Sequence, residues 1–138
     1  MMLEELALKY YSQGYNCAET IVMAANEAYR LNLDSSHVRL FAAFGGGLQC
    51  GDLCGCLTGA AGVISLLHVS SKAHDTPELK GYVQFLVREF EKEMGGRKCV
   101  DIKPRLYKKE IKCRDTVAKG ARALEKTIEL IQIQRAQN

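Results

Sequence analysis

The sequence lacks the fingerprints of the common enzyme classes. Its 138 residues contain no Walker A, GxSxG, HExxH or dinucleotide-binding motif. The glycine triplet at residues 45–47 has no flanking strand pattern, so it does not have the context of a phosphate-binding loop. These absences weigh against a conventional hydrolase or transferase, and we expect no nucleotide cofactor.

The sequence also lacks the sustained apolar–polar alternation of β-strands. Apolar residues recur instead at helical spacing almost throughout the chain. No internal repeat, low-complexity tract or linker divides it. We therefore expect residues 1–138 to form a single all-α domain, a compact bundle of about five to six helices with a glycine- and cysteine-rich turn before a buried central helix.

Capping residues and glycines mark the ends of the first helices. A first helix ends at Gly14, and Asn16 is the expected cap of the second. A cap at Ser35 or Ser36 predicts a short helix that runs to Phe44, where the glycine triplet stops it.

The central helix is expected to begin at an Asp52 cap and to run to about Ser70. The uncharged stretch 53–71 inside it resembles a membrane span in length, but cysteines, glycines and a histidine interrupt it. We therefore interpret it as a buried helix and expect no membrane insertion.

Two further helices follow this central one. A start at residues 76–78 predicts a helix that ends at Gly95, and residues 97–112 are expected to be a loop or a short turn of helix around Pro104. The last helix opens near residues 113–115. Its apolar stripe has the heptad spacing of a bundle or of a homodimer formed through the C-terminal helix, and consists of Val117, Ala121, Leu124, Ile128 and Ile131.

Positive charge is concentrated between residues 97 and 114, where eight basic side chains accompany only two acidic ones. Such a surround favours thiolates and would offset the charge of a thiolate-bound metal. A solvated basic loop explains the charges equally well. Nucleic acid is not an expected partner, because only Tyr107 is available there to stack on a base.

The N-terminal residues carry acidic side chains where a signal peptide has basic ones, which predicts a cytoplasmic protein. Thiols stay reduced in that compartment, so clustered cysteines are more often metal-binding or catalytic than disulfide-bonded. There is no CxxC, which disfavours a thioredoxin-type pair or a zinc ribbon, and no CxxCH, which disfavours haem. The six cysteines are Cys17, Cys50, Cys54, Cys56, Cys99 and Cys113.

Four of these cysteines, Cys17, Cys54, Cys56 and Cys113, lie at expected helix starts, where free backbone N–H groups lower a thiol pKa. Such positions suit redox chemistry or metal ligation. Residues two apart in a helix point to different faces, so Cys54 and Cys56 should not share one ion unless the backbone there is irregular.

Three glycines of the central helix, Gly55, Gly59 and Gly62, line one face, so something approaches that backbone closely. Either another helix or a cofactor lying against Gly55 and Gly59 would explain them. The histidines, His37, His68 and His74, are expected in structural or solvated roles, with His68 the nearest to an additional ligand.

The chain resembles the C_GCAxxG_C_C family of redox-active proteins. The resemblance rests on residues 14–19 (GYNCAE), 44–47 (FGGG) and 54–60 (CGCLTGA), followed by Cys99 and Cys113. It implies an all-helical domain whose four family cysteines fall on Cys17, Cys54, Cys99 and Cys113. It also implies redox activity or a prosthetic group such as an iron–sulfur cluster, with an oxidoreductase- or transporter-associated partner.

The sequence departs from that family pattern at two thiols. Cys56 stands where the family motif CGAxxG has alanine, and Cys50 is a further addition. Each is open to interpretation as a resolving cysteine, a replacement metal ligand or a spectator.

Two classes of function follow from these observations. In the first, Cys17, Cys54, Cys99 and Cys113 form one thiolate site for electron transfer through an iron–sulfur cluster or for thiol–disulfide exchange, as an oxidoreductase or an electron-transfer accessory protein. In the second, the chain is a non-enzymatic interaction module with a structural zinc site or merely packed thiols.

Overall fold

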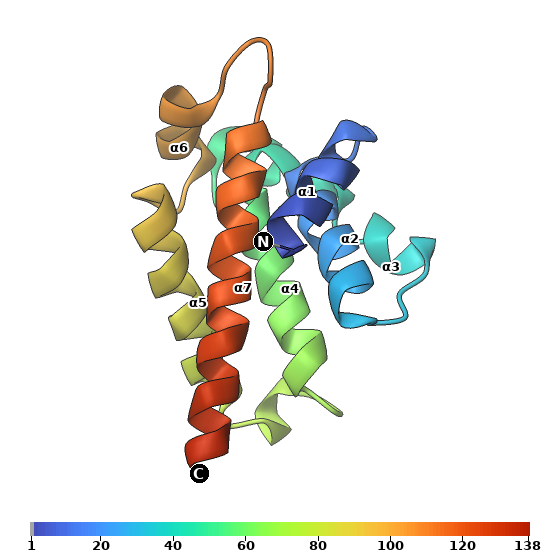
Figure 1. The fold of residues 1–138 in the computed structure, drawn as a ribbon, viewed down its shortest axis with the longest axis vertical. Helices are drawn as coiled ribbons and strands as arrows, with labels where there is room; N and C mark the ends of the chain where they lie inside the picture. The colour runs from blue at the N-terminus through green and yellow to red at the C-terminus, as the bar shows by residue number, and fades with distance from the viewer. Residues whose placement is uncertain (1) are drawn as a thin grey trace.

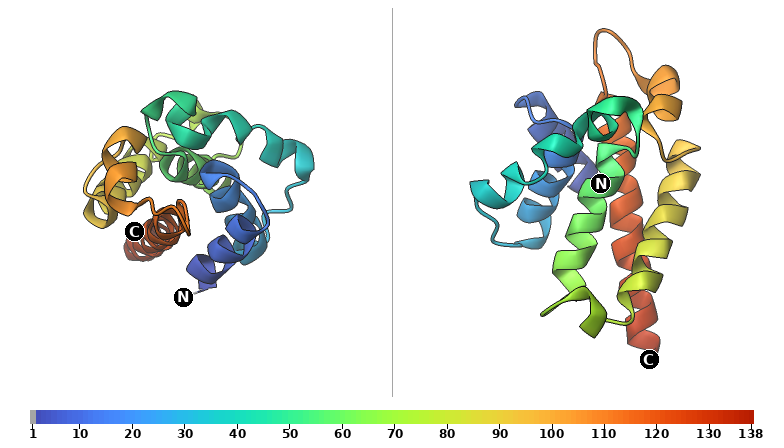
Figure 2. Two further views of the ribbon diagram at one scale, coloured as in Figure 1. Left: turned by 90° about the horizontal axis from the view of Figure 1, so that it is seen from above. Right: turned by 180° about the vertical axis from the view of Figure 1, so that it is seen from behind.

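Helix α7 runs the length of the molecule, and the other long helices pack around it (Figures 1 and 2). The computed structural model describes residues 2–138 and contains, within that range, seven α-helices and no strand, which confirms the all-α prediction. The helices are α1 (Met2–Ser12), α2 (Cys17–Tyr29), α3 (Ser35–Arg39), α4 (Gly55–His68), α5 (Leu79–Met94), α6 (Cys99–Leu106) and α7 (Arg114–Gln137).

The start of α2 forms as the sequence predicts. Asn16 Oδ1 accepts a hydrogen bond from the Glu19 N–H at 3.0 Å, and Glu19 Oε1 accepts one from the Asn16 N–H at 3.0 Å. This reciprocal capping box satisfies two N–H groups that the first turn would otherwise leave without a partner. Asn16 Nδ2 also donates to the Ala42 carbonyl at 2.9 Å, which fixes the α2 start against the later turn.

The N-cap of α3 is not the residue that the sequence predicts. Asp34, not Ser35 or Ser36, caps α3, because its carboxylate accepts from the Ser36 and His37 N–H groups. α3 then ends at Arg39, and Ala42–Phe44 forms a separate 3₁₀ turn (η1).

The start of α4 also differs from the prediction. Asp52 does not cap α4, because its carboxylate instead accepts from the adjacent Leu53 N–H at 2.8 Å. Cys54 is the N-cap residue of α4, with extended backbone angles, and no side chain caps this helix. In the first α4 turn the Leu57 N–H donates to the Cys54 carbonyl at 2.9 Å, whereas the Gly55 N–H is left for another partner.

The segment before α4 is a tightly curved turn. Gly47–Gly51 (η2) follows Gly46, and both Leu48 and Gln49 have left-handed backbone angles, with φ of 59° and 61°. Left-handed angles are costly for residues that carry a Cβ, and they concentrate at functional sites. The glycine- and cysteine-rich turn that the sequence predicts is thus present.

Residues 99–106 form an eight-residue helix, α6, with Pro104 inside it, so the helical alternative of the prediction, and not the loop, describes this part of the segment. Ile102 is 1% exposed and anchors this helix to the core. Burial of such a side chain contributes about 1.5–3 kcal/mol, comparable with the cost of a proline in a helix.

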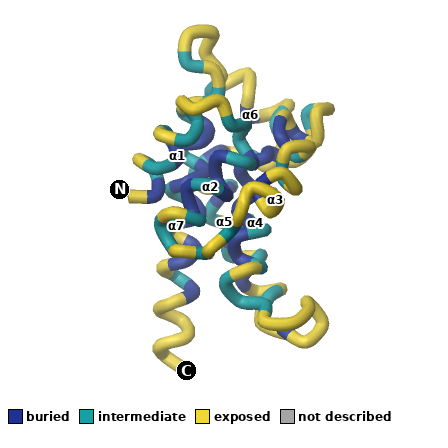
Figure 3. Tube along the Cα trace, turned by 90° about the vertical axis from the view of Figure 1, so that its right-hand side faces the viewer, coloured by how far each residue is buried: buried dark blue, intermediate teal, exposed yellow. Residues whose placement is uncertain are grey.

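The core lies where α2, α4, α5 and α7 meet, and the exposed residues gather in the loops and at the C-terminal end of α7 (Figure 3). The heptad stripe of α7 is buried within the chain, from Val117 at 0% to Ile128 at 5% exposure. The stripe therefore serves the bundle and does not present a dimer interface. None of the helices in residues 2–138 combines the length and apolarity needed to span a bilayer.

Candidate functional site

The four family cysteines line one cavity of about 60 Å³ at the end of the bundle where α2, α4, α6 and α7 begin. We call this cavity the thiol pocket. It is lined by Cys17, Gly46, Cys54, Gly55, Cys99, Ile102, Lys103, Cys113 and Thr116. Its volume is about that of two water molecules at ~30 Å³ each, so it has no room for an organic molecule. All six cysteines of the chain are free thiols.

Cys17 enters the thiol pocket from the first residue of α2. A Cβ built on Gly55 would lie 2.5 Å from Cys17 Sγ, and one on Gly59 would lie 2.8 Å from the Ala18 carbonyl oxygen. The crossing of α2 therefore explains Gly55 and Gly59, whereas a Cβ on Gly62 would lie 2.5 Å from the ring of Phe41. Gly55 still borders the pocket, but Gly59, expected as a cofactor contact, is covered by α2.

Cys54 and Cys99 are brought together by a pair of backbone hydrogen bonds. The Cys54 N–H donates to the Arg97 carbonyl at 2.8 Å, and the Cys99 N–H donates to the Asp52 carbonyl at 2.7 Å. These bonds form an isolated antiparallel bridge between Leu53 and Lys98. The bridge fixes the start of α6 against the start of α4.

Cys113 reaches the same pocket from the residue before α7. Its N–H donates to the hydroxyl of Tyr11 at the end of α1, at 3.0 Å. This contact joins residues 102 positions apart in the sequence. Each of the four cysteines is therefore held by a different element.

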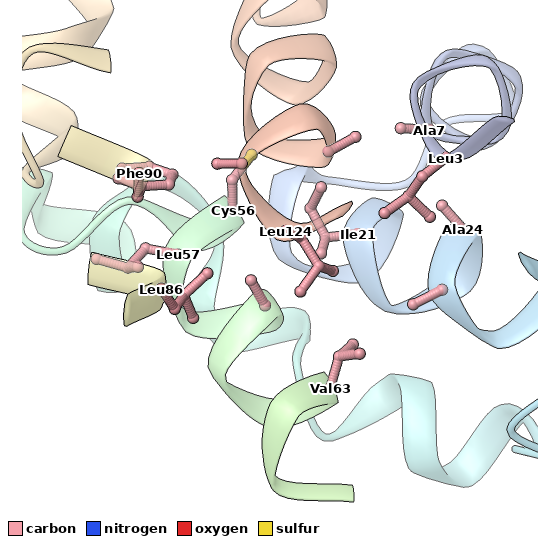
Figure 4. Close-up of a cluster of buried hydrophobic side chains, with 14 of the residues drawn as sticks. Leu3, Ala7, Ile21, Ala24, Cys56, Leu57, Val63, Leu86, Phe90 and Leu124 are labelled. Carbon is pink, nitrogen blue, oxygen red and sulfur yellow. The ribbon is translucent and has the colours of Figure 1, made fainter. Parts of the chain in front are cut away.

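Cys56 is the innermost thiol and is 0% exposed. A Cβ on Gly120 of α7 would lie 2.7 Å from Cys56 Cβ, so this glycine makes the recess in which Cys56 sits. Figure 4 shows the Cys56 side chain directed from α4 towards α7. Its sulfur lies 3.9 Å from the Thr116 carbonyl oxygen and hydrogen-bonds with the sulfurs of Cys17 and Cys54. The extended backbone at Cys54 is the irregularity that lets residues two apart meet.

The electrostatics of the site favour a thiolate at Cys17. A hydrogen bond from the Cys56 thiol, followed by bonds from the Gly46, Ala18 and Gly55 N–H groups, lowers the pKa of Cys17 to about 6, although burial opposes this shift. These N–H groups come from the starts of α2 and α4 and from the left-handed turn. At Cys17 these N–H groups are the physical cause of the lowered pKa that the sequence predicts for a cysteine at a helix start.

Cys54 and Cys56 complete this network of sulfurs. The Cys56 thiol, and after it the Cys56 and Leu57 N–H groups, also lower the pKa of Cys54, and burial and the charge on Cys17 oppose that shift. Donation to Cys17 and Cys54, together with full burial, raises the pKa of Cys56 well above its ordinary value. A thiol has a single proton to donate, so Cys17, Cys54 and the Thr116 carbonyl compete for it, and at most one thiolate at a time is stabilised.

Burial, then the negative charges on the neighbouring sulfurs, raises the pKa of Cys99 and of Cys113, and Lys103 alone opposes this. The basic stretch thus acts on the site chiefly through Lys103. Three other basic side chains of this stretch have partners outside the site. Arg97 forms an ion pair with Glu91, Lys108 forms one with Asp115, and Arg105 donates a hydrogen bond to the Met94 carbonyl.

Thr116 is a pocket residue that sequence reasoning missed. It is 4% exposed, and its hydroxyl is buried with no hydrogen-bond partner within the described part of the chain. A buried hydroxyl without a partner is costly, so its presence beside four sulfurs is a feature of the site. Its O–H is available to donate to a thiolate or to a small molecule in the pocket. No local sequence signal marks a threonine inside a helix as such a group.

The other sequence candidates lie outside the thiol pocket. Cys50 is exposed on the η2 turn, and its sulfur contacts the Gly47 carbonyl at 3.6 Å. His68 is at the far end of α4, with its ring centre 4.8 Å from that of Tyr82. His37 belongs to the cap of α3, and His74 is exposed.

The arrangement of side chains does not match a metal centre. Within residues 2–138, no three His, Cys, Asp or Glu side chains are grouped as the ligands of one metal ion. A cluster or a zinc ion would therefore require the four cysteine side chains to move. The positions as they stand fit thiol chemistry.

Comparison with known proteins gives the family of the chain. No curated protein and no solved structure matches the chain. Residues 15–127, well over half of the chain, match the family described as "Putative redox-active protein (C_GCAxxG_C_C)". The chain therefore belongs to the C_GCAxxG_C_C family of redox-active proteins.

Proposed function

We propose that this protein carries out thiol–disulfide exchange, with Cys17 as the low-pKa thiolate of the thiol pocket. The observation that carries this proposal is the surround of the Cys17 sulfur, which accepts hydrogen bonds from three backbone N–H groups and from the Cys56 thiol. The thiolate is the form that attacks disulfides, and its optimum pKa lies near the ambient pH.

The exchange converts two thiols of the pocket into one disulfide. Two electrons and two protons pass to an external disulfide, which becomes two thiols. Cys17 and one of the other pocket cysteines form the protein disulfide, and an external reductant of the thiol class reverses the step. The family description supports a redox role, and a reducing compartment such as the cytoplasm, with an oxidoreductase- or transporter-associated protein as partner, completes the proposal.

The test is an oxidation of the anaerobically purified protein by a neutral disulfide, followed by mass spectrometry and disulfide mapping. We expect the wild type to lose two hydrogens reversibly, with Cys17 in the new bond. Cys17→Ser should form no internal disulfide at the same concentration. Ser71→Ala, an exposed change in the loop after α4, is the control and should behave as the wild type, because Ser71 lines neither the thiol pocket nor its surroundings.

Binding of an iron–sulfur cluster or zinc is the competing function, since four cysteines around one cavity supply a thiolate ligand set. Metal analysis and an absorption spectrum of the same anaerobic sample separate the two. Iron with sulfide, or stoichiometric zinc, bound through Cys17 would overturn thiol exchange as the function. A metal-free protein that forms the Cys17 disulfide reversibly would support it.

A further inference from the structure

A second and much larger pocket of about 650 Å³ adjoins the thiol pocket. We call it the outer pocket. The η2 turn with Gln49 and Cys50 forms one of its sides, and α6 with Val100, Lys103 and Tyr107 forms the other. Its volume lies in the range of roughly 300–1,000 Å³ that is typical of sites for small molecules. The left-handed residues of η2 give this side its curvature.

The two pockets share part of their lining. Gly46, Cys99 and Lys103 border both cavities. Cys99 is the one cysteine common to the two, whereas Cys17, Cys54 and Cys113 border only the inner one. Cys99 is also half-exposed, so its sulfur is accessible from outside.

The sizes of the pockets decide where an external disulfide reacts first. A space of about two water molecules cannot hold an organic disulfide, so such a molecule cannot reach Cys17 directly. The outer pocket has ample room for one. Two thiols line the outer pocket, Cys50 and Cys99, and only Cys99 also borders the thiol pocket, so exchange that reaches Cys17 begins at Cys99.

The charge of the outer pocket indicates which disulfides it selects. Lys103 is the one charged side chain in its lining. Its ammonium lies 4.9 Å from the centre of the Tyr107 ring and forms no ion pair within residues 2–138. The other pocket side chains, such as Gln49 and Tyr107, are neutral. An unpaired cation in a pocket attracts an anionic ligand and repels a cationic one.

We propose that the outer pocket is the substrate site for small anionic disulfides, and that Cys99 is the thiol that receives them. This inference rests on the proposed function of the thiol pocket. The Cys99 thiolate, after losing its proton to solvent, attacks one sulfur of the disulfide RSSR. A Cys99–SR bond forms and one RS⁻ leaves. The Cys17 thiolate then attacks Cys99 Sγ, releases the second RS⁻ and forms a Cys17–Cys99 disulfide.

The test compares three disulfides of similar size and different charge: 3,3′-dithiodipropionate as the anion, 2-hydroxyethyl disulfide as the neutral molecule and cystamine as the cation. The rate of internal disulfide formation is measured by mass spectrometry at low salt. We expect the anion to react roughly tenfold faster than the cation, with the neutral compound between them and the difference shrinking in high salt.

Charge and trapping variants make the test specific. Lys103→Glu should reverse the order of the three disulfides, whereas Lys109→Glu, an exposed control in the same basic stretch, should leave it unchanged. Cys17→Ser should trap the probe as a mixed disulfide on Cys99. Equal rates for all three charges, or a probe trapped on Cys50, would overturn this proposal.

These failures are distinguishable from a failure of the proposed function. Equal rates accompanied by a reversible Cys17 disulfide leave thiol exchange in place and remove only the charge selection. Absence of any internal disulfide with the neutral compound overturns both proposals together.

Discussion

Removal of the Cys56 thiol should raise the pKa of Cys17. In the structure Cys56 supplies the largest of the contributions that lower this pKa to about 6. A hydrogen bond to a charged group contributes about 1.5–3 kcal/mol, and one pKa unit corresponds to about 1.36 kcal/mol. Because S–H is a weak donor, the effect should lie at the lower end, about one unit. Cys56→Ala should then move the pKa of Cys17 from about 6 to about 7.

The assay is the pH dependence of Cys17 alkylation by iodoacetamide, followed on the Cys17 peptide by mass spectrometry. At pH 6 the thiolate fraction should fall from about one half to about one tenth, so the alkylation rate should fall roughly fivefold. Cys56→Ser has lost about the same packing but retains an O–H donor, so its profile should stay near that of the wild type.

Cys50→Ser serves as the control for the general loss of a thiol, since Cys50 is exposed and does not border the thiol pocket. The reasoning is refuted if Cys56→Ala leaves the midpoint of the profile unchanged. It is refuted equally if Cys56→Ser shifts the midpoint as far as Cys56→Ala does, because the effect would then come from packing and not from the donor.

Three further predictions follow from the site and its supports. Gly55→Ala places a Cβ 2.5 Å from Cys17 Sγ, so it should displace the thiol and lower the free energy of unfolding in urea by about 1–3 kcal/mol. Gly81→Ala, with open space around its Cβ, should raise that free energy by roughly 0.5–1 kcal/mol. Equal effects of the two variants would contradict the tight crossing. Asn16→Ala removes the capping box and should lower the free energy of unfolding by about 1 kcal/mol, and no measurable loss would count against the cap. Because the pKa of Cys17 is lower in the folded state, its stabilising effect is full above the unfolded-state pKa and is lost as the pH falls through about 6. The stability difference between wild type and Cys17→Ser should therefore grow from about pH 5.5 to about pH 8.5, and a flat difference would contradict the shift.

Local signals in the sequence are sufficient for the parts of the site that rest on short-range geometry. The Asn16 cap is readable because the capping box involves residues only three apart. The glycine spacing of α4 predicts a close crossing for the same reason, since it reflects one face of a single helix. Neither signal says which element makes the crossing: the sequence favoured another helix over a cofactor, and the fold identifies that helix as α2 by placing Ala18 there.

Long-range contacts account for what the sequence could not provide. Cys99 belongs to a helix that the sequence left undecided between a loop and a short helical turn, because Pro104 is locally a helix breaker while the burial of Ile102 is a tertiary effect. The bridge between Leu53 and Lys98 is a single pair of backbone hydrogen bonds with no side-chain pattern to reveal it. The contact of Cys113, the residue before α7, with Tyr11 at the end of α1 likewise has no periodic signal in the sequence.

The electrostatic role of Cys56 shows why a list of cysteines does not identify the reactive one. Six thiols have the same intrinsic chemistry, and four were expected at helix starts. The structure separates them by the donors that each sulfur meets: Cys17 accepts several, whereas burial without such donors raises the pKa of Cys99 and Cys113. The basic stretch of residues 97–114, which holds the highest concentration of positive charge in the sequence, contributes only Lys103 to the charged lining of the thiol pocket. Backbone N–H groups and one neighbouring thiol, rather than nearby positive charge, therefore determine which cysteine carries the thiolate.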